Sequence, residues 1–133
     1  MNVLVTGENE FASACLCDFG IAKIGEGTAS SLPGTPAYMP PEACAGSYGF
    51  ANDVFAYGVS IWECFSRQTP FAGISDCRDI RDSWLTGTKL NGFQIGDPII
   101  RTLFKQCTEI SKDKRVSSDA IVAWYVTNAN RKI

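Results

Sequence analysis

Residues 53–65, DVFAYGVSIWECF, decide the fold of this 133-residue chain. Nearly every position after Asp53 is apolar, on all faces of a helix, and such a helix belongs in the middle of a core. Asp53 can cap its N-terminus, and Thr69-Pro70 stops it. The run also contains Ser60 and Glu63, and it is too short and too polar to span a membrane. The stretch therefore predicts a buried central helix.

Three amphipathic helices are predicted after this central one. Asp97-Pro98 is a typical helix start, and Ser118 can cap the last helix. The apolar positions of each helix share one face, which comprises Cys77, Ile80, Trp84 and Leu85 in the first, Ile99, Ile100, Leu103, Phe104 and Cys107 in the second, and Ile121, Val122, Trp124 and Tyr125 in the third.

The N-terminal part of the chain has a different pattern. Residues 3–5 and 14–17 predict two short strands around a turn at residues 6–9. Residues 24–36 are rich in Gly, Ser, Thr and Pro, which predicts a mobile surface loop with a functional role. The predicted fold class is mainly α with a small N-terminal β-hairpin.

Composition excludes several classes of function. Apolar residues make up 45% and charged residues 20%, as in an ordinary globular domain. Twelve Lys and Arg against fourteen Asp and Glu give a net charge of −2, which offers no basic face for nucleic acid or anionic lipid. The N-terminus does not read as a secretory signal. We therefore expect an intracellular, cytoplasmic protein with no nucleic-acid partner and no membrane segment.

Histidine and cysteine usage narrows the chemistry further. The chain has no histidine, so it cannot build a Ser-His-Asp triad, a Cys-His nucleophile or a Cys₂His₂ zinc site. Its six cysteines are expected to be reduced. Cys15 and Cys17 would share one face of a strand, where buried thiols are the favoured interpretation and a small redox or metal site is the alternative.

Three motifs occur in order along the chain. They are Asp18-Phe19-Gly20, then GTPAYMPPE at residues 34–42, then DVFAYG at residues 53–58. Together they resemble the C-terminal lobe of a protein kinase catalytic domain, over essentially the whole chain. The resemblance implies a partial kinase-like fold for residues 1–133. Residues 1–17 would be the end of the catalytic loop and the hairpin, residues 18–42 the activation segment, and residues 43–133 the helical lobe.

The resemblance also implies a nucleotide site. Asp18 is similar to the aspartate that holds Mg²⁺ between the ATP phosphates, and Asn2 to the second Mg²⁺ ligand. Leu4, Cys17 and Asp18 would contact ATP. Phe19 and Gly20 resemble the switch between active and inactive states.

Residues 34–42 resemble the segment that cradles the protein substrate. Thr35 would support catalysis by hydrogen-bonding the catalytic aspartate, which is typical of serine/threonine kinases. The phrase DVFAYGVSIWEC looks more like the tyrosine-kinase-like group, and a serine/threonine kinase of that group reconciles both features.

Further residues resemble scaffold and regulatory positions of the family. Glu42 and Arg115 would form a buried ion pair, and Asp53 would hold the catalytic-loop backbone as a structural residue. The candidate phosphorylation sites of the activation loop are Thr28, Ser30 and Ser31.

Several kinase motifs are not among these residues, namely the glycine-rich loop, the phosphate-binding lysine and the His-Arg-Asp motif. One hypothesis is therefore a fragment of an active serine/threonine kinase, inactive alone, whose partners are a protein substrate and the missing N-terminal lobe and catalytic loop. On this hypothesis the His-Arg-Asp motif is encoded just upstream of Met1. The alternative is a stand-alone kinase-like remnant that acts as a non-catalytic binding module.

Overall fold

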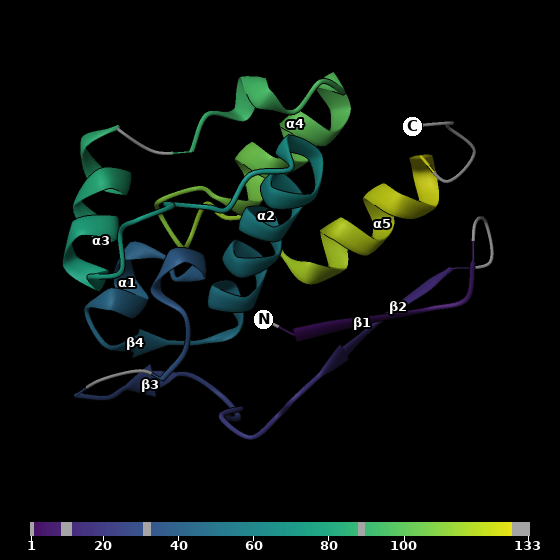
Figure 1. The fold of residues 1–133 in the computed structure, drawn as a ribbon. Coiled ribbons are helices and arrows are strands. Elements are labelled where there is room, and N and C mark those ends of the chain that lie inside the picture. The colour runs from purple at the N-terminus through teal and green to yellow at the C-terminus, as the bar shows by residue number, and fades with distance from the viewer. Residues whose placement is uncertain (1, 9–11, 31–32, 88–89, 129–133) are drawn as a thin grey trace.

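The computed structural model of the chain describes residues 2–8, 12–30, 33–87 and 90–128. Its helices are α1 (Pro41–Cys44), α2 (Phe50–Ser66), α3 (Cys77–Thr86), α4 (Pro98–Cys107) and α5 (Ser118–Asn128). Its strands are β1 (Asn2–Thr6), β2 (Ser13–Cys17), β3 (Gly27–Thr28) and β4 (Ser47–Tyr48). Among the described residues, Pro36–Tyr38 and Gly92–Gln94 form 3-10 helices. Figure 1 shows α2 in the middle of the helices and the β1–β2 hairpin at the edge. The predicted fold class is confirmed.

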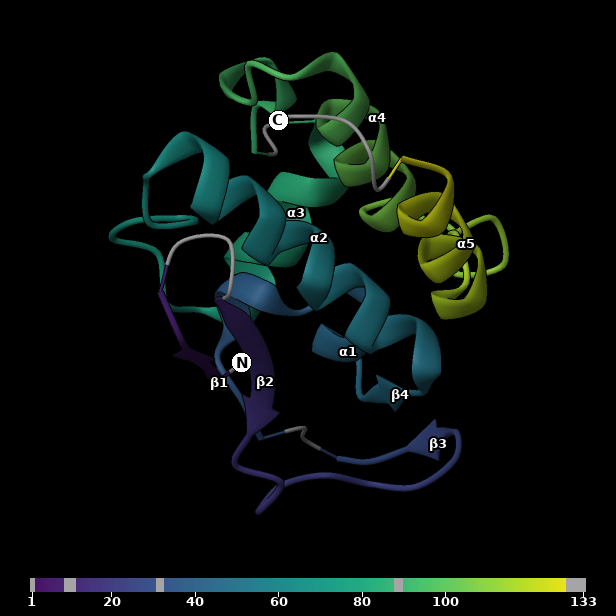
Figure 2. The same cartoon turned by 90° about the vertical axis from the view of Figure 1, so that its right-hand side faces the viewer.

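The N-terminal hairpin is antiparallel, as predicted. Asn2 pairs with Cys17, Leu4 with Cys15 and Thr6 with Ser13. Its apolar side chains are largely exposed; they are Val3, Leu4, Val5 and Leu16. The hairpin therefore stands outside the core, which the turned view in Figure 2 also shows.

Helix α2 is the predicted central helix, but it begins earlier than Asp53. Gly49 is its N-cap and offers no side-chain cap, so Asp53 lies within the first turn. The prediction that Asp53 caps the helix is wrong, since Phe50, Ala51 and Asn52 already have helical geometry. A carboxylate in the first turn is still favoured by the positive end of the helix dipole. The helix ends at Ser66, followed by Arg67 in a left-handed conformation (φ 56°).

The core forms where α2 packs against α3, α4 and the chain that joins them. Trp84 is buried and meets Phe55 and Phe71 edge to face, with ring centroids 4.9 and 5.6 Å apart. The other fully buried apolar side chains include Val59, Ile80, Ile95, Leu103 and Cys107. Trp62 anchors the same core by donating its indole N–H to the backbone oxygen of Asn91 at 3.0 Å.

The close approach of α2 and α4 depends on Gly58. A Cβ atom there would lie 2.6 Å from Cys107 Cβ and 2.9 Å from Thr108 Cγ2. Gly58→Ala should therefore destabilise the fold by about 1–3 kcal/mol, although alanine is the better helix former. Gly96→Ala is the matched control, because a Cβ there meets nothing within 4 Å. Urea unfolding of both variants measures the difference, and an unchanged Gly58→Ala midpoint would contradict the close packing.

The predicted buried face holds for α4 except that Ile99 is half-buried, and it holds only in part for the other two helices. Ile80 and Trp84 of α3 are buried, whereas Leu85 is 57% exposed. In α5 only Ile121 is buried and Trp124 half-buried, so the prediction is wrong for Val122 and Tyr125. Helix α5 lies at the margin of the fold (Figure 1). A narrow face that contains Ile121 and Trp124 packs it against the core.

Two further expectations need correction. The hydroxyl of Ser117, not Ser118, accepts the backbone N–H of Ala120 at 3.2 Å at the start of α5. Cys44 and Cys77 form a disulfide, so they are not reduced as predicted. Their proximity comes from the packing of α1 on α3, across 33 positions of sequence. Within the described ranges, no helix is long and apolar enough to cross a membrane.

Candidate functional site

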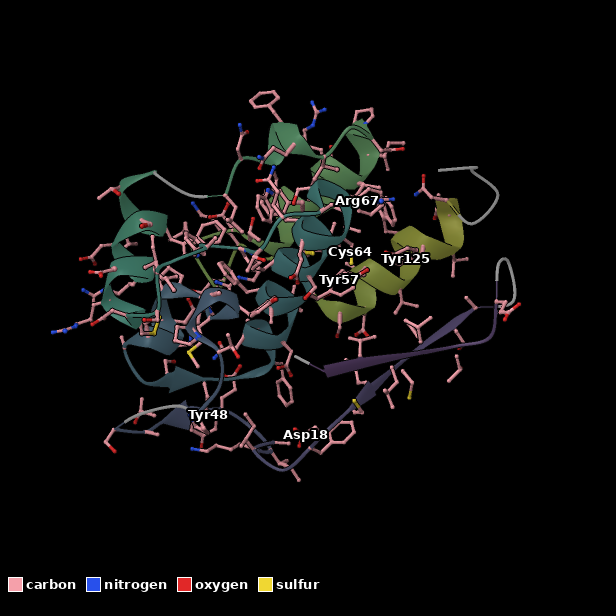
Figure 3. The ribbon with its side chains drawn as sticks, in the orientation of Figure 1. Asp18, Tyr48, Tyr57, Cys64, Arg67 and Tyr125 are labelled. Carbon is pink, nitrogen blue, oxygen red and sulfur yellow. A yellow bond between two sulfur atoms is a disulfide. The ribbon has the colours of Figure 1, made fainter. Side chains whose placement is uncertain are left out.

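A cavity of about 460 Å³ lies between the end of β2, the segments that follow it and the start of α2. Several residues singled out in the sequence line it together: Cys17, Asp18, Phe19, Thr35, Tyr38 and Asp53. They come from three stretches that are far apart in the chain. Figure 3 shows Asp18 on the outer segment of this region, below α2. The fold thus gathers the three motifs around one space.

Asp18 sits at a sharp turn directly after β2. Its backbone is left-handed (φ 63°), a conformation that aspartate tolerates better than most residues. One carboxylate oxygen accepts the backbone N–H of Gly20 at 3.3 Å. A Cβ at position 20 would lie 3.3 Å from that same oxygen, so glycine suits this turn. The turn holds the Asp18 carboxylate at the cavity and leaves Phe19 68% exposed.

The segment at residues 34–42 is tied to α2 through Tyr38. Residues Pro36–Tyr38 form a 3-10 turn, in which the backbone N–H of Tyr38 donates to the oxygen of Thr35 at 3.1 Å. The Tyr38 hydroxyl donates to Glu63 Oε2 at 2.7 Å. Burial, then the bond to Glu63, raises the pKa of Tyr38 to about 12. This contact fixes the segment at the mouth of the cavity.

Removing the Tyr38 hydroxyl should weaken that attachment. We expect Tyr38→Phe to lower the free energy of unfolding by about 1 kcal/mol at pH 8. Because the folded-state pKa is raised above the unfolded value of 10, this contribution is complete below pH 10 and is lost as the pH rises towards 12. Urea unfolding at increasing pH measures it, with Tyr48→Phe as control. A difference between wild type and Tyr38→Phe that stays constant through pH 12 would contradict the titration.

Glu42 and Arg115 form the ion pair that the sequence predicts. Arg115 Nη1 lies 2.7 Å from Glu42 Oε1, and the Arg115 side chain is fully buried. The guanidinium also donates to the backbone oxygens of Ala51 at 2.8 Å and Glu109 at 2.9 Å. It lies over the ring of Phe55, 4.9 Å from the centroid. One cation thereby joins α1, the start of α2 and the turn before α5.

The loop at residues 24–36 is partly ordered by a small sheet. Strand β3 pairs with β4, and the backbone N–H of Ala29 donates to the oxygen of Gly46 at 2.8 Å. A Cβ at Gly46, which has φ 91°, would collide with the backbone oxygen of Ala29. Thr28 and Ser30 remain exposed on this sheet edge, as a surface loop requires.

Comparison with known proteins identifies the family. The protein kinase domain family matches residues 1–125 of the chain. The chain belongs to the protein kinase domain family.

The relatives of this kinase domain include serine/threonine kinases. It is 28% identical to mouse serine/threonine-protein kinase WNK4 over 124 residues, 92% of this chain and 10% of that protein. It is 28% identical over 120 residues to a putative mitogen-activated protein kinase kinase kinase 7-like protein of Drosophila melanogaster, 85% of this chain and 30% of that protein. Over 67 residues, 47% of this chain and 9% of the relative, it is 42% identical to the mitogen-activated protein kinase kinase kinase zak-1 of Caenorhabditis elegans. The chain therefore spans a small part of each relative's length.

Leu4, Thr28 and Ser30 do not line the cavity. Leu4 is exposed on β1, and Thr28 and Ser30 lie along the loop. The side chain of Asn2 and the whole of Ser31 fall outside the described residues. The strand register nevertheless places Asn2 opposite Cys17, the residue before Asp18.

Sequence reasoning missed Glu63 as the partner of Tyr38. The sequence does indicate such a contact, because Glu63 is a carboxylate within an apolar helix and a carboxylate in that setting requires a hydrogen-bond partner. The contact of α2 with α5 was missed as well, where the hydroxyls of Tyr57 and Tyr125 lie 2.5 Å apart (Figure 3). Burial, then the neighbouring Tyr125 hydroxyl, raises the pKa of Tyr57 well above its ordinary value.

Proposed function

We propose that this chain is the C-terminal lobe portion of a serine/threonine protein kinase of the tyrosine-kinase-like group. The complete kinase transfers the γ-phosphate of ATP to Ser or Thr hydroxyls of proteins. The supporting observation is the Asp18 turn, which holds a carboxylate at a cavity shared with Thr35 and the first turn of α2. The division at residues 17 and 42 into hairpin, activation segment and helical lobe is part of the same proposal, as is a cytoplasmic location.

The residues around Asp18 fit a magnesium nucleotide. Mg²⁺ prefers carboxylate and amide oxygens, and it needs few protein ligands because phosphates and water complete its shell. Asp18 would be one ligand and Asn2 the other, since the register places Asn2 opposite Cys17. Mg²⁺ bound there would neutralise charge on the phosphates during transfer. Cys17 lines the cavity and Leu4 lies on the paired strand, so both are proposed contacts of the nucleotide.

The choice of serine and threonine as acceptors rests on the segment at residues 34–42. Thr35 opens this segment at the cavity, where its hydroxyl can assist the catalytic aspartate of the complete kinase. The Tyr38–Glu63 contact holds the middle of the segment, and the Glu42–Arg115 contact holds its C-terminal end. The relatives include the mouse serine/threonine-protein kinase WNK4, which agrees with this acceptor class. Phosphoamino-acid analysis of the complete kinase tests it, and phosphotyrosine alone would refute it.

The isolated 133-residue chain should have no kinase activity. Phosphoryl transfer depends on positioned groups, and the catalytic aspartate and phosphate-binding lysine are not among these residues. With Mg-ATP and a generic protein substrate, we expect no phosphate transfer above that of Asp18→Ala. Transfer that depends on Asp18 would show that the chain is a complete enzyme. A chain that is inactive and also gives no Asp18-dependent activity in its parent protein would support the binding-module alternative.

A further inference from the structure

The disulfide between Cys44 and Cys77 joins two segments that the proposed function does not link. Cys44 is the last residue of α1 and Cys77 is the first residue of α3. Their Cα atoms are 5.6 Å apart, a usual separation for a disulfide. Figure 1 and Figure 2 both show α1 close to α3. The bond therefore fastens one end of the segment at residues 34–44 to a helix that follows α2.

A third sulfur lies beside this bond. The thioether of Met39 is 3.9 Å from the sulfur of Cys77. Met39 closes the Pro36–Tyr38 turn, and its backbone N–H donates to the oxygen of Pro36 at 2.9 Å. Cys77 at the start of α3 therefore contacts two elements. It meets the turn that contains Tyr38 through Met39, and it is joined to α1 through the disulfide.

The cysteines of the chain differ in exposure, and the free Cys17 is half-buried like the two bonded ones. Cys44 and Cys77 are both partly exposed, so a small thiol can reach the bond. Cys107 is fully buried, and desolvation raises the pKa of its thiol to about 12, which makes it inert. Cys64 is exposed on α2 and is free. In a compartment where glutathione keeps thiols reduced, a disulfide is usually transient or redox-sensing.

We propose that Cys44 and Cys77 form a reversible thiol–disulfide switch that locks residues 34–44 against α3. The oxidant is a low-molecular-weight disulfide such as oxidised glutathione. One cysteine thiolate attacks it and releases one glutathione thiolate, which gives a mixed disulfide. The second cysteine thiolate attacks the mixed disulfide and releases the second glutathione. In balance, two protein thiols and one oxidised glutathione give one protein disulfide and two reduced glutathiones.

The reduced protein should remain folded, because the switch is not what holds α1 in place. Glu42, two residues before Cys44, is bonded to Arg115, and we expect this ion pair to hold α1 when the disulfide is open. The oxidised form gains the constraint of a closed loop of about 33 residues, which we expect to raise Tm by about 10 °C. Opening the bond should mainly loosen α3 and the turn at Pro36–Tyr38. An effect of this loosening on substrate docking would depend on the proposed function. The disulfide switch itself does not depend on it.

The test is a redox titration of the 133-residue chain. The chain is equilibrated in glutathione buffers that span about a thousandfold range of reduced to oxidised ratio, and free thiols are then alkylated and assigned by peptide mass spectrometry. Cys44 and Cys77 should become protected together within this range. Cys64→Ser should leave the titration unchanged, whereas Cys77→Ser should abolish the protection of Cys44.

Hydrogen exchange on the wild-type chain gives a second measurement, which does not depend on whether a cysteine variant folds. Residues 77–86 and 36–39 should exchange at least about tenfold faster after reduction and recover when the bond reforms. Two outcomes would overturn the switch: thiols that never pair in the most oxidising buffer, or a bond that the most reducing buffer leaves closed. Neither outcome depends on kinase activity, so the result of this test is independent of whether the proposed function is correct.

Discussion

Arg115→Met is expected to lower the free energy of unfolding by about 3–5 kcal/mol. The guanidinium is fully buried, and it bonds the Glu42 carboxylate as well as backbone oxygens of Ala51 and Glu109. Methionine fills much of the volume but donates nothing. The loss would leave a carboxylate and the backbone oxygens of Ala51, Glu109 and Ile110 without this donor, in a region that water reaches poorly.

Glu42→Gln should cost less than Arg115→Met. The Glu42 side chain is 19% exposed, and its amide replacement keeps one oxygen that can accept from Arg115 Nη1. The Arg115 cation also retains its backbone oxygens in this variant. The two variants should therefore differ, although they alter the same contact.

A double-mutant cycle isolates the pair itself. The double variant should cost much less than the sum of the single losses, because each single variant leaves a buried partner uncompensated. Urea unfolding of the four proteins measures the coupling. Arg78→Met is a matched control, since its pair with Asp76 is exposed and should leave stability almost unchanged. Simple additivity across Glu42 and Arg115 would contradict the coupling.

The sequence predicted the elements whose local pattern is strong. Helix α2 carries a long run that is mostly apolar, and the hairpin has two short apolar strands around a Gly turn. The start of α2 was misplaced because Asp53 looks like a cap, while the actual cap, Gly49, has no side-chain signal. A residue with an acceptor side chain is the expected N-cap when only the local sequence is considered. Packing in the folded chain can nevertheless extend the helix N-terminal to that residue.

Contacts between distant residues were predictable only where a family motif named both partners. Glu42 and Arg115 are 73 positions apart and were paired by resemblance alone. No such motif joins Cys44 to Cys77, or Tyr38 to Glu63, and their meeting depends on how α1 and the Pro36–Tyr38 turn pack. The α5 face was overestimated for a related reason, because apolar periodicity does not reveal how many neighbours a helix has.

Asp18→Ala carries the largest expected effect on function. In the complete kinase of the proposed function, we expect it to lower kcat by at least about 100-fold, because the proposed role of this carboxylate is to hold the Mg²⁺ that neutralises charge on the phosphates during transfer. The Asp18 turn would persist in part, since the backbone N–H of Ala22 still donates to the oxygen of Phe19 at 3.0 Å. A loss of activity would then reflect the missing ligand and not an unfolded segment.

Metal dependence separates a magnesium ligand from a structural residue at position 18. Asp18→Asn keeps an oxygen and a similar shape but loses the charge, so it should raise the Mg²⁺ concentration needed for half-maximal rate while leaving Tm nearly unchanged. Asp113→Asn, at an exposed position of the turn before α5, is the matched control and should change neither quantity. A structural role for Asp18 would instead lower Tm and leave the Mg²⁺ dependence as in the wild type. Measuring the rate against Mg²⁺ concentration together with a thermal unfolding curve therefore decides between the two roles.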